Sequence, residues 1–294
     1  MSPSQAASRK AARPGRDAVA AKGWLAAHKW LLRRRACQAG VLAAFLAGPW
    51  FGVWIVKGNL SSSLILDVLP LTDPYLLMQM LAAGFVPAAT AVTGALILAA
   101  FYLLAGGRVF CAWVCPVNMI TDAAGWLRRR LEIKAGHAPD ARSRYWLLAG
   151  TLIAAAATGS LAWEWVNPVS IAHRGLLFGM GAGLWFLAAV FFYDLLVASR
   201  GWCGHLCPMG AFYGLLGKTA LLRVAAPGRD ACNDCMDCFA VCPEPQVIRP
   251  AVKKAGQESP VIRDALCTTC GRCIDVCGQR VFNLTHRFDQ RSSS

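Results

Sequence analysis

Two cysteine runs near the C-terminus decide how this part of the chain folds. They are Cys232-Asn-Asp-Cys235-Met-Asp-Cys238-Phe-Ala-Val-Cys242 and Cys267-Thr-Thr-Cys270-Gly-Arg-Cys273-Ile-Asp-Val-Cys277. Both have the spacing C-x2-C-x2-C-x3-C, and together they use eight of the 13 cysteines. With this spacing, three thiolates of a tight loop bind one [4Fe–4S] cluster and the fourth ligates the other cluster. Soft thiolate ligands suit iron–sulfur chemistry. The sequence therefore predicts two [4Fe–4S] clusters.

The crossed pattern divides the eight cysteines into two predicted ligand sets. The first cluster is expected on Cys232, Cys235, Cys238 and Cys277, and the second on Cys267, Cys270, Cys273 and Cys242. Zinc is the alternative metal, but zinc knuckles normally use two separate CxxC pairs. Structural cysteines or disulfides would not need so regular a spacing. Pro243 follows the first run, whereas Gly278 stands at the equivalent place in the second, where we expect a looser turn but no lost ligand.

The rest of the chain has the composition of a membrane protein. Hydrophobic residues make up 56% and charged residues only 16%, against about 25% charged in typical globular domains. Buried helices of a soluble protein are the alternative. Four uncharged stretches approach the roughly 20 residues that a membrane-spanning helix needs, at about 36–56, 84–105, 145–163 and 175–193. The predicted fold class is thus a membrane all-α domain, with four transmembrane helices as two repeated hairpins, plus a small C-terminal α+β domain like bacterial ferredoxin.

Lys and Arg are distributed unevenly between the expected loops. Residues 1–35 carry nine, 57–83 one, 106–144 seven, 164–174 one, and the remainder 12. Short loops rich in Lys and Arg stay on the cytoplasmic side. We therefore expect a multi-pass protein of the bacterial cytoplasmic (inner) membrane, with both termini and both clusters cytoplasmic. The net charge of +14 then reflects topology, and no nucleic-acid partner is expected.

These features divide the chain into four predicted segments. They are a disordered basic N-terminus (1–35), a membrane domain (36–222), two ferredoxin-type repeats (223–287, at about 223–252 and 258–287) and a tail (288–294). Arg33, Arg34 and Arg35 before an apolar run also fit a twin-arginine export signal. The spanning length of that run, and its lack of an obvious A-x-A cleavage site, favour an anchor that remains in the protein.

The membrane domain repeats one phrase. Arg108-Val-Phe-Cys111-Ala-Trp-Val-Cys115-Pro116 follows the second span and Arg200-Gly-Trp-Cys203-Gly-His-Leu-Cys207-Pro208 the fourth, 92 residues later. A spacing of i, i+4 puts both thiols on one helical face, and duplicated hairpins would bring the two copies together. The four cysteines could ligate a metal or cluster, form redox-active dithiols or simply pack in a turn. His205 has no counterpart in the first copy, and Cys37 is expected to pack within the first span.

A quinone site would need polar groups near a membrane face that can exchange a proton. Glu164, His173 and Asp194 are the candidates, because ionisable groups in or near spans are often functional. Each could instead be a solvated interfacial residue. The sequence contains no nucleotide-binding loop, Rossmann fingerprint or CxxCH haem motif.

In combination, these motifs resemble the NapH-type ferredoxin-like membrane subunits of periplasmic nitrate reductase systems. The resemblance covers about residues 33–287. It also includes the phrases Gly48–Gly52, Val56–Leu60, Leu69–Pro74 and Trp163–Pro168. Related membrane polyferredoxins serve nitrous oxide reduction, methylamine oxidation and oxidase assembly.

The resemblance implies an electron-transfer component of a quinol dehydrogenase rather than a complete enzyme. Its electrons would come from membrane quinol and pass, with a soluble periplasmic iron–sulfur partner, toward the nitrate reductase complex. The alternative is an iron–sulfur membrane factor for assembly or reductive maturation of a partner metalloenzyme.

Overall fold

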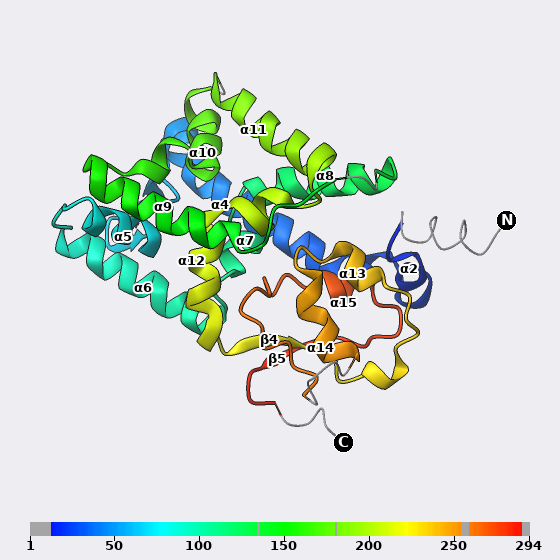
Figure 1. Ribbon diagram of the computed structural model, residues 1–294. Coiled ribbons are helices and arrows are strands. Elements are labelled where there is room, and N and C mark those ends of the chain that lie inside the picture. The colour runs from blue at the N-terminus through cyan, green and yellow to red at the C-terminus, as the bar shows by residue number, and fades with distance from the viewer. Residues whose placement is uncertain (1–12, 134–135, 180, 254–258, 290–294) are drawn as a thin grey trace.

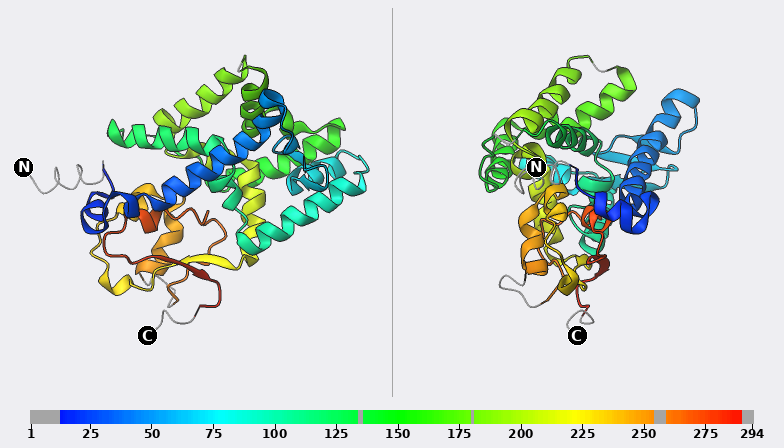
Figure 2. Two further views of the ribbon diagram at one scale, coloured as in Figure 1. Left: turned by 180° about the vertical axis from the view of Figure 1, so that it is seen from behind. Right: turned by 90° about the vertical axis from the view of Figure 1, so that its right-hand side faces the viewer.

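The computed structural model describes residues 13–133, 136–179, 181–253 and 259–289, and it consists of two parts (Figure 1). We call α4 to α12 the helical half and the segment from β4 to β5 the ferredoxin half. Two further views show that the N-terminal helices lie against the ferredoxin half, at the end away from α6 (Figure 2). Each half has its own buried hydrophobic cluster, one around Tyr75, Phe110 and Tyr213, the other around Val224, Ile248 and Phe282.

The helical half is a bundle in which α9 packs against α5 and α12. Its α-helices are α4 (Lys29–Phe51), α5 (Pro74–Ala82), α6 (Ala89–Ala105), α7 (Val109–Trp113), α8 (Val117–Arg130), α9 (Ser143–Thr158), α10 (Pro168–Phe178), α11 (Gly183–Phe192) and α12 (Pro208–Leu216). Short 3-10 or π turns connect them at η1 (Ala162–Trp165), η2 (Tyr193–Val197), η3 (Trp202–Leu206) and η4 (Gly217–Thr219). Two helices begin alike, because Asp73 and Asn167 each accept an N-terminal backbone N–H and a proline follows each. Such caps satisfy amide groups that have no partner inside the helix.

A small antiparallel sheet follows α4. Its strands are β1 (Val56–Gly58), β2 (Ser62–Ile65) and β3 (Leu69–Thr72), in that order. Lys57 pairs with Leu64, and Ser63 pairs with Leu71. Strand β3 packs on α6.

The ferredoxin half is closed by a two-stranded antiparallel ribbon of its first and last strands. In β4 (Leu222–Ala225) and β5 (Asn283–His286), Val224 pairs with Leu284. Between them lie η5 (Arg229–Ala231), α13 (Asp237–Val241), η6 (Pro245–Val247), α14 (Ile248–Lys253) and α15 (Arg272–Val276). Each cysteine run therefore ends on a short helix, α13 or α15.

The N-terminal segment differs from the sequence prediction. Residues 1–12 lie outside the described residues, but the rest of 1–35 is largely helical, in α2 (Arg16–Lys22), α3 (Trp24–Ala27) and the start of α4. The carboxylate of Asp275 on α15 accepts hydrogen bonds from the backbone N–H groups of Trp30 and Leu31, at 3.0 and 2.8 Å. It satisfies two amide groups of the first turn of α4. The predicted disorder of the described part of this segment is therefore wrong. The local sequence does not reveal the helix, because the carboxylate that caps α4 belongs to the distant ferredoxin half.

The prediction of four transmembrane helices is also wrong. Among the described residues, none of the helices combines the length and the apolar character needed to cross a membrane. The first two turns of α4 contain four charged residues, Lys29 and Arg33 to Arg35. Helices α6 and α9 have 17 and 16 residues, short of the roughly 20 required. The fourth stretch is broken between Phe178 and Gly183, where α10 ends and α11 begins. Composition does not reveal such a break.

Candidate iron–sulfur sites

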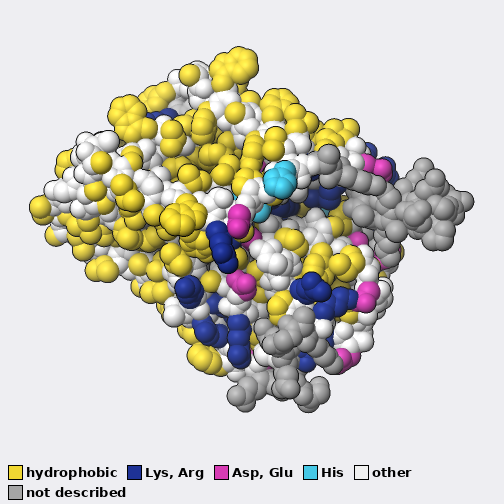
Figure 3. All heavy atoms as spheres, in the orientation of Figure 1, with side chains coloured by type: hydrophobic (Ala, Val, Ile, Leu, Met, Phe, Trp, Pro, Cys, Tyr) yellow, Lys and Arg dark blue, Asp and Glu magenta, His cyan; other side chains and the backbone are white. Residues whose placement is uncertain are grey.

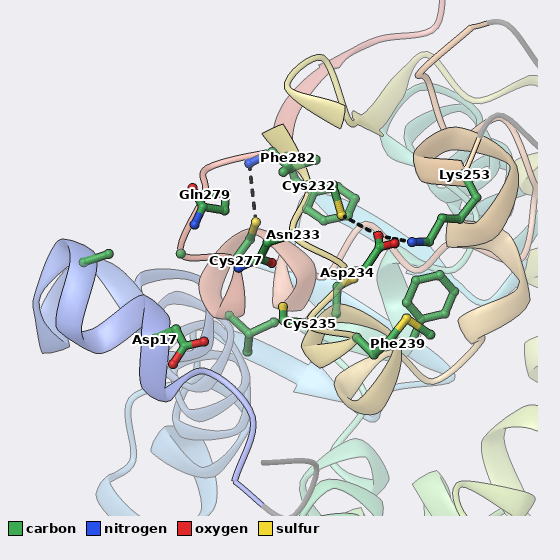
Figure 4. Close-up of a pocket in the computed structure, with 16 residues that line it drawn as sticks. Asp17, Cys232, Asn233, Asp234, Cys235, Phe239, Lys253, Cys277, Gln279 and Phe282 are labelled. Carbon is green, nitrogen blue, oxygen red and sulfur yellow. Dashed lines mark hydrogen bonds and ion pairs between the residues drawn. The ribbon is translucent and has the colours of Figure 1, made fainter. Parts of the chain in front are cut away.

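The first of two cysteine-lined cavities lies at the surface of the ferredoxin half. Cys232, Cys235, Cys238 and Cys277 all line it. Figure 4 shows that Cys232 and Cys235 reach it from the loop before α13, and Cys277 from the end of α15. The backbone N–H of Val281 donates to the Cys277 sulfur at 3.4 Å. The lining also includes Asp17 and an ion pair between Asp234 and Lys253 (Figure 4).

The second cavity is lined by the other four cysteines of the two runs, Cys242, Cys267, Cys270 and Cys273. It is more enclosed by protein, since the exposed fractions of Cys270 and Cys273 are 7% and 9%. Each predicted ligand set therefore surrounds one cavity, and the last cysteine of each run lines the cavity of the other run. Cluster binding by these residues stays a prediction.

The loops that carry the first cysteines of both runs have the same backbone shape. Asp234 and Met236 have φ angles of 55° and 63°, and the equivalent Thr269 and Gly271 have 47° and 72°. Turns that alternate right- and left-handed residues point several backbone N–H groups at one spot, which suits an anionic iron–sulfur cluster. Donor chemistry and loop shape both fit such clusters. In the described part of the chain, no group of three His, Cys, Asp or Glu forms a ready site for a single metal ion.

Arginine charge beside the second cavity favours the thiolate form of Cys270. Burial raises the pKa of the Cys270 thiol, but the guanidinium groups of Arg272 and Arg34 outweigh it and bring this pKa to about 7. Burial raises the pKa of Cys267 to about 11, which the nearby Arg223 and Arg108 oppose. A thiolate is the ligand form of cysteine. The chain thus places arginine charge next to the second ligand set.

The two CxxxCP copies come together in the helical half. Cys111 lies in α7 and Cys203 in η3. Cys111, Cys115 and Cys207 belong to or pack against the same hydrophobic cluster. Burial and the neighbouring Cys111 together raise the pKa of Cys207 to about 12. The structure brings the two repeats together, while the role of their thiols stays a prediction.

The arginine that opens each repeat connects the helical half to the second cavity. Arg108 donates to the Glu244 carboxylate at 2.5 Å, to the Leu266 carbonyl at 3.1 Å and to the Cys203 carbonyl at 3.1 Å. Arg200 donates to Asp122 at 2.8 Å and to the Val241 carbonyl at 3.2 Å. Sequence analysis gave these arginines no role. The signal in the sequence was that an arginine stands three residues before the first cysteine of both CxxxCP copies.

The three quinone-site candidates are not in one place. Glu164 accepts hydrogen bonds from Ser170 at 2.6 Å and Asn167 at 2.9 Å. Buried His173 packs edge-on against Phe45, with ring centroids 5.0 Å apart. Asp194 is elsewhere, close to the second CxxxCP copy: it accepts from the Trp202 backbone N–H at 2.9 Å, and burial raises its pKa to about 7.

Asp73 is a further buried carboxyl besides these three candidates. It accepts hydrogen bonds from the Tyr213 hydroxyl at 2.9 Å and from the Tyr75 backbone N–H at 3.0 Å. Burial raises its pKa to about 7. Its position as a helix cap before Pro74 was visible in the sequence, but its burial was not.

Family models match both halves of the chain. A 4Fe-4S binding domain matches residues 87–134 and 178–227, each with one CxxxCP copy, and a 4Fe-4S dicluster domain matches residues 231–281. Iron–sulfur family similarity therefore extends over residues 87–281 and is not confined to a small C-terminal domain, which corrects the predicted fold class a second time.

Several known proteins are similar over almost the whole chain. The "Ferredoxin-type protein NapH" of Escherichia coli is 52% identical over 95% of this chain and 97% of its own length. The "Methylamine utilization ferredoxin-type protein MauN" of Paracoccus denitrificans is 54% identical over 92% of this chain and 95% of its own length. The "Ferredoxin-type protein NapH" of Haemophilus influenzae is 46% identical over 94% of this chain and 96% of its own length. No solved structure matches. The chain thus belongs to the family of ferredoxin-type iron–sulfur electron-transfer proteins that includes NapH and MauN.

Proposed function

We propose that this chain carries electrons from membrane quinol toward a periplasmic nitrate-reducing complex, as one component of a quinol dehydrogenase. The supporting observation is the pair of neighbouring cavities, each lined by four cysteines of the crossed ligand sets. When bound there, [4Fe–4S] clusters supply one-electron transfer.

The residues around the cavities have separate tasks in this proposal. Thiolates of the two sets hold the clusters, and the left-handed turns at Asp234 and Thr269 direct backbone N–H groups toward them. The apolar side chains of Val247, Ile248 and Ile262, which line the second cavity, keep water from it. The more open first cavity is the one that can exchange electrons on the cytoplasmic side, and the second lies closer to the helical half, through which electrons would pass toward the periplasmic partner.

Nitrate is the proposed end of the pathway, although NapH and MauN relatives are about equally similar to the chain. The basis for choosing nitrate is that the phrases Leu69–Pro74 and Trp163–Pro168 resemble those of the NapH-type subunits. A soluble periplasmic iron–sulfur subunit would be the direct partner. Methylamine oxidation is the competing pathway, and it serves as one arm of the test.

We also propose that the chain is held at the bacterial cytoplasmic membrane, with the ferredoxin half on the cytoplasmic side. Figure 3 shows hydrophobic side chains over much of the visible face of the helical half, and Lys and Arg over the ferredoxin half. Large exposed apolar residues of the helical half include Phe101, Leu104, Trp146, Trp185 and Phe192. Exposed apolar areas of this kind mark interaction surfaces. We expect the chain to stay with membranes after an alkaline wash, and a periplasm-dependent reporter fused after Ser294 to be silent.

The function is tested by comparing membranes with and without the chain for quinol-dependent nitrate reduction. The activity of the reductase itself is measured in parallel with an artificial electron donor, and methylamine-dependent respiration is the second arm. Lost quinol-dependent activity with normal artificial-donor activity is the expected result.

Two other outcomes contradict the proposal. Loss of both nitrate activities would support the assembly-factor alternative, because the reductase would then be defective itself. Intact nitrate reduction with impaired methylamine respiration would place the chain in the methylamine pathway.

A further inference from the structure

One carboxylate joins four arginines from three separate parts of the chain. We call Asp122 of α8 and these arginines the Asp122 node. Its N–O distances are 3.4 Å to Arg34, 2.6 Å to Arg35, 2.8 Å to Arg200 and 2.6 Å to Arg272. The exposed side-chain fraction is 11% for Asp122 and 7% or less for Arg34, Arg200 and Arg272.

A second group of the same kind also borders the second cavity. Glu244, which lines that cavity, binds Arg108 at 2.5 Å and Arg144 at 2.6 Å, and both arginine side chains are 1% exposed. We call these residues the Glu244 node. In both nodes guanidinium groups outnumber carboxylates. Buried charge without a counter-charge is costly, so the excess positive charge indicates a further anion nearby.

The second ligand set is that anion. Arg272 lines the second cavity between Cys270 and Cys273. The charges of Arg272 and Arg34 act on Cys270, that of Arg200 acts on Cys242, and that of Arg108 acts on Cys267. Arginine charge therefore acts on three of its four cysteines.

The first cavity has a different charge environment. Its charged lining residues are Asp17, Asp234 and Lys253, and no arginine is among the described residues that line it. The Asp234–Lys253 pair is at the surface, with side-chain exposures of 67% and 31%. Water screens such charges far more than buried ones. The same cysteine ligands thus have different electrostatic surroundings in the two cavities: an exposed Asp–Lys pair at the first and buried arginines at the second.

We propose that the Asp122 node is a built-in counter-charge for the second cluster, and that it raises the reduction potential of this cluster above that of the first. Reduction adds one negative charge to an already anionic cluster, and nearby buried positive charge stabilises that added charge. An electron shared by the two clusters then rests mainly in the second cavity, beside the CxxxCP cysteines. The inference depends on the proposed clusters but not on quinol or nitrate.

The test is a redox titration of the purified, cluster-loaded protein, followed by electron paramagnetic resonance, with iron content measured in parallel. Arg272→Gln should weaken electron binding at one cluster about tenfold, a downward shift of about 59 mV for a one-electron couple. Arg34→Gln should act in the same direction, and Arg272→Lys should retain most of the wild-type potential. Arg35→Gln is the matched control, since Arg35 binds Asp122 but is 27% exposed.

The sign of the shift separates electrostatics from packing. Asp122→Asn removes the one negative group of the node and should raise the same potential, opposite to Arg272→Gln. Shifts of equal sign in all variants, or no shift with normal iron content, would overturn the inference. If Asp122→Asn does not fold, the graded series of Arg272, Arg34 and Arg35 variants still tests whether buried positive charge sets the reduction potential of the second cluster. A wild-type protein with iron for only one cluster would overturn the proposed cluster placement, and the inference with it.

Discussion

The first and second cavities are built from the same cysteine phrase, yet their surroundings differ. The first is open at the surface, next to an exposed ion pair, whereas the second contains buried Cys270 and Cys273 and is lined by a member of each arginine node. The cysteine spacing determines what can bind, and the packing of the helical half determines how the bound group behaves. This difference leaves the first cavity within reach of a partner and the second inside the protein.

Removing one thiolate from either cavity should have the largest effect. Purified protein should hold about eight irons per chain if both clusters form. Cys235→Ser and Cys270→Ser should each lower iron content by up to half, because no spare cysteine lines either cavity. Cys270→Ser should also lower the thermal stability, since its cavity is part of the buried core. Cys37→Ser is the control and should leave iron unchanged. Unaltered iron in the two variants, or zinc in its place, would contradict the prediction.

Substituting the CxxxCP cysteines tests whether the relay continues beyond the second cavity. If Cys111, Cys115, Cys203 and Cys207 form one redox or metal site, each single Ser variant should lose nearly as much quinol-linked activity as the quadruple variant. Residues that act as a unit are not additive. Membrane abundance, iron content and electron transfer should be measured for each. Lower abundance with normal turnover per molecule would indicate a structural role. Full activity in the quadruple variant would leave the two ferredoxin-type sites as the redox centres.

The Glu244 node should contribute more to stability than the ion pair at the first cavity. Glu244→Gln leaves two buried arginines without their carboxylate, which should cost about 3–5 kcal/mol in the free energy of unfolding. Asp234→Asn, the matched control, removes a carboxylate from an exposed pair and should change stability little. Denaturant unfolding of the cluster-loaded variants measures both. Similar losses in the two variants would mean that burial of the second cavity is less important than the structure indicates.

The cysteine sites were predictable because their information is local. A spacing of two or three residues between cysteines determines the loop, and the crossed ligand sets of the family pattern match the linings of both cavities. The repeat around Cys111 and Cys203 was visible for the same reason. Family likeness followed from these motifs and is confirmed.

Features that depend on distant contacts were missed. The N-terminus looked disordered because its helix cap, Asp275, is about 245 positions away from Trp30. The fourth span looked continuous, although α10 ends at Phe178 and α11 begins at Gly183. Neither arginine node could be found, because Asp122 gathers partners from α4, α15 and the segment before η3. Hydropathy and composition carry no record of such contacts.

The smallest predicted effect compares equivalent positions in the two cysteine loops. Met236 and Gly271 both have left-handed backbones, with φ of 63° and 72°. A side chain in this conformation costs roughly 1–2 kcal/mol, which glycine avoids at some cost in unfolded-state entropy. Met236→Gly should therefore stabilise the protein by up to about 1 kcal/mol.

The reverse type of change should be harmful in the second loop. A Cβ on Gly271 would come within 2.4 Å of the Trp30 ring, which itself packs edge-on against Trp113 with ring centroids 6.1 Å apart. Gly271→Ala should therefore destabilise the protein, because the ring can move only by disturbing the contact between α4 and the second cysteine loop. Thermal unfolding of both variants, at matched iron content, measures the contrast. Shifts of the same sign would show that the two loops are held alike, and that the surroundings of the second cavity do not constrain its backbone.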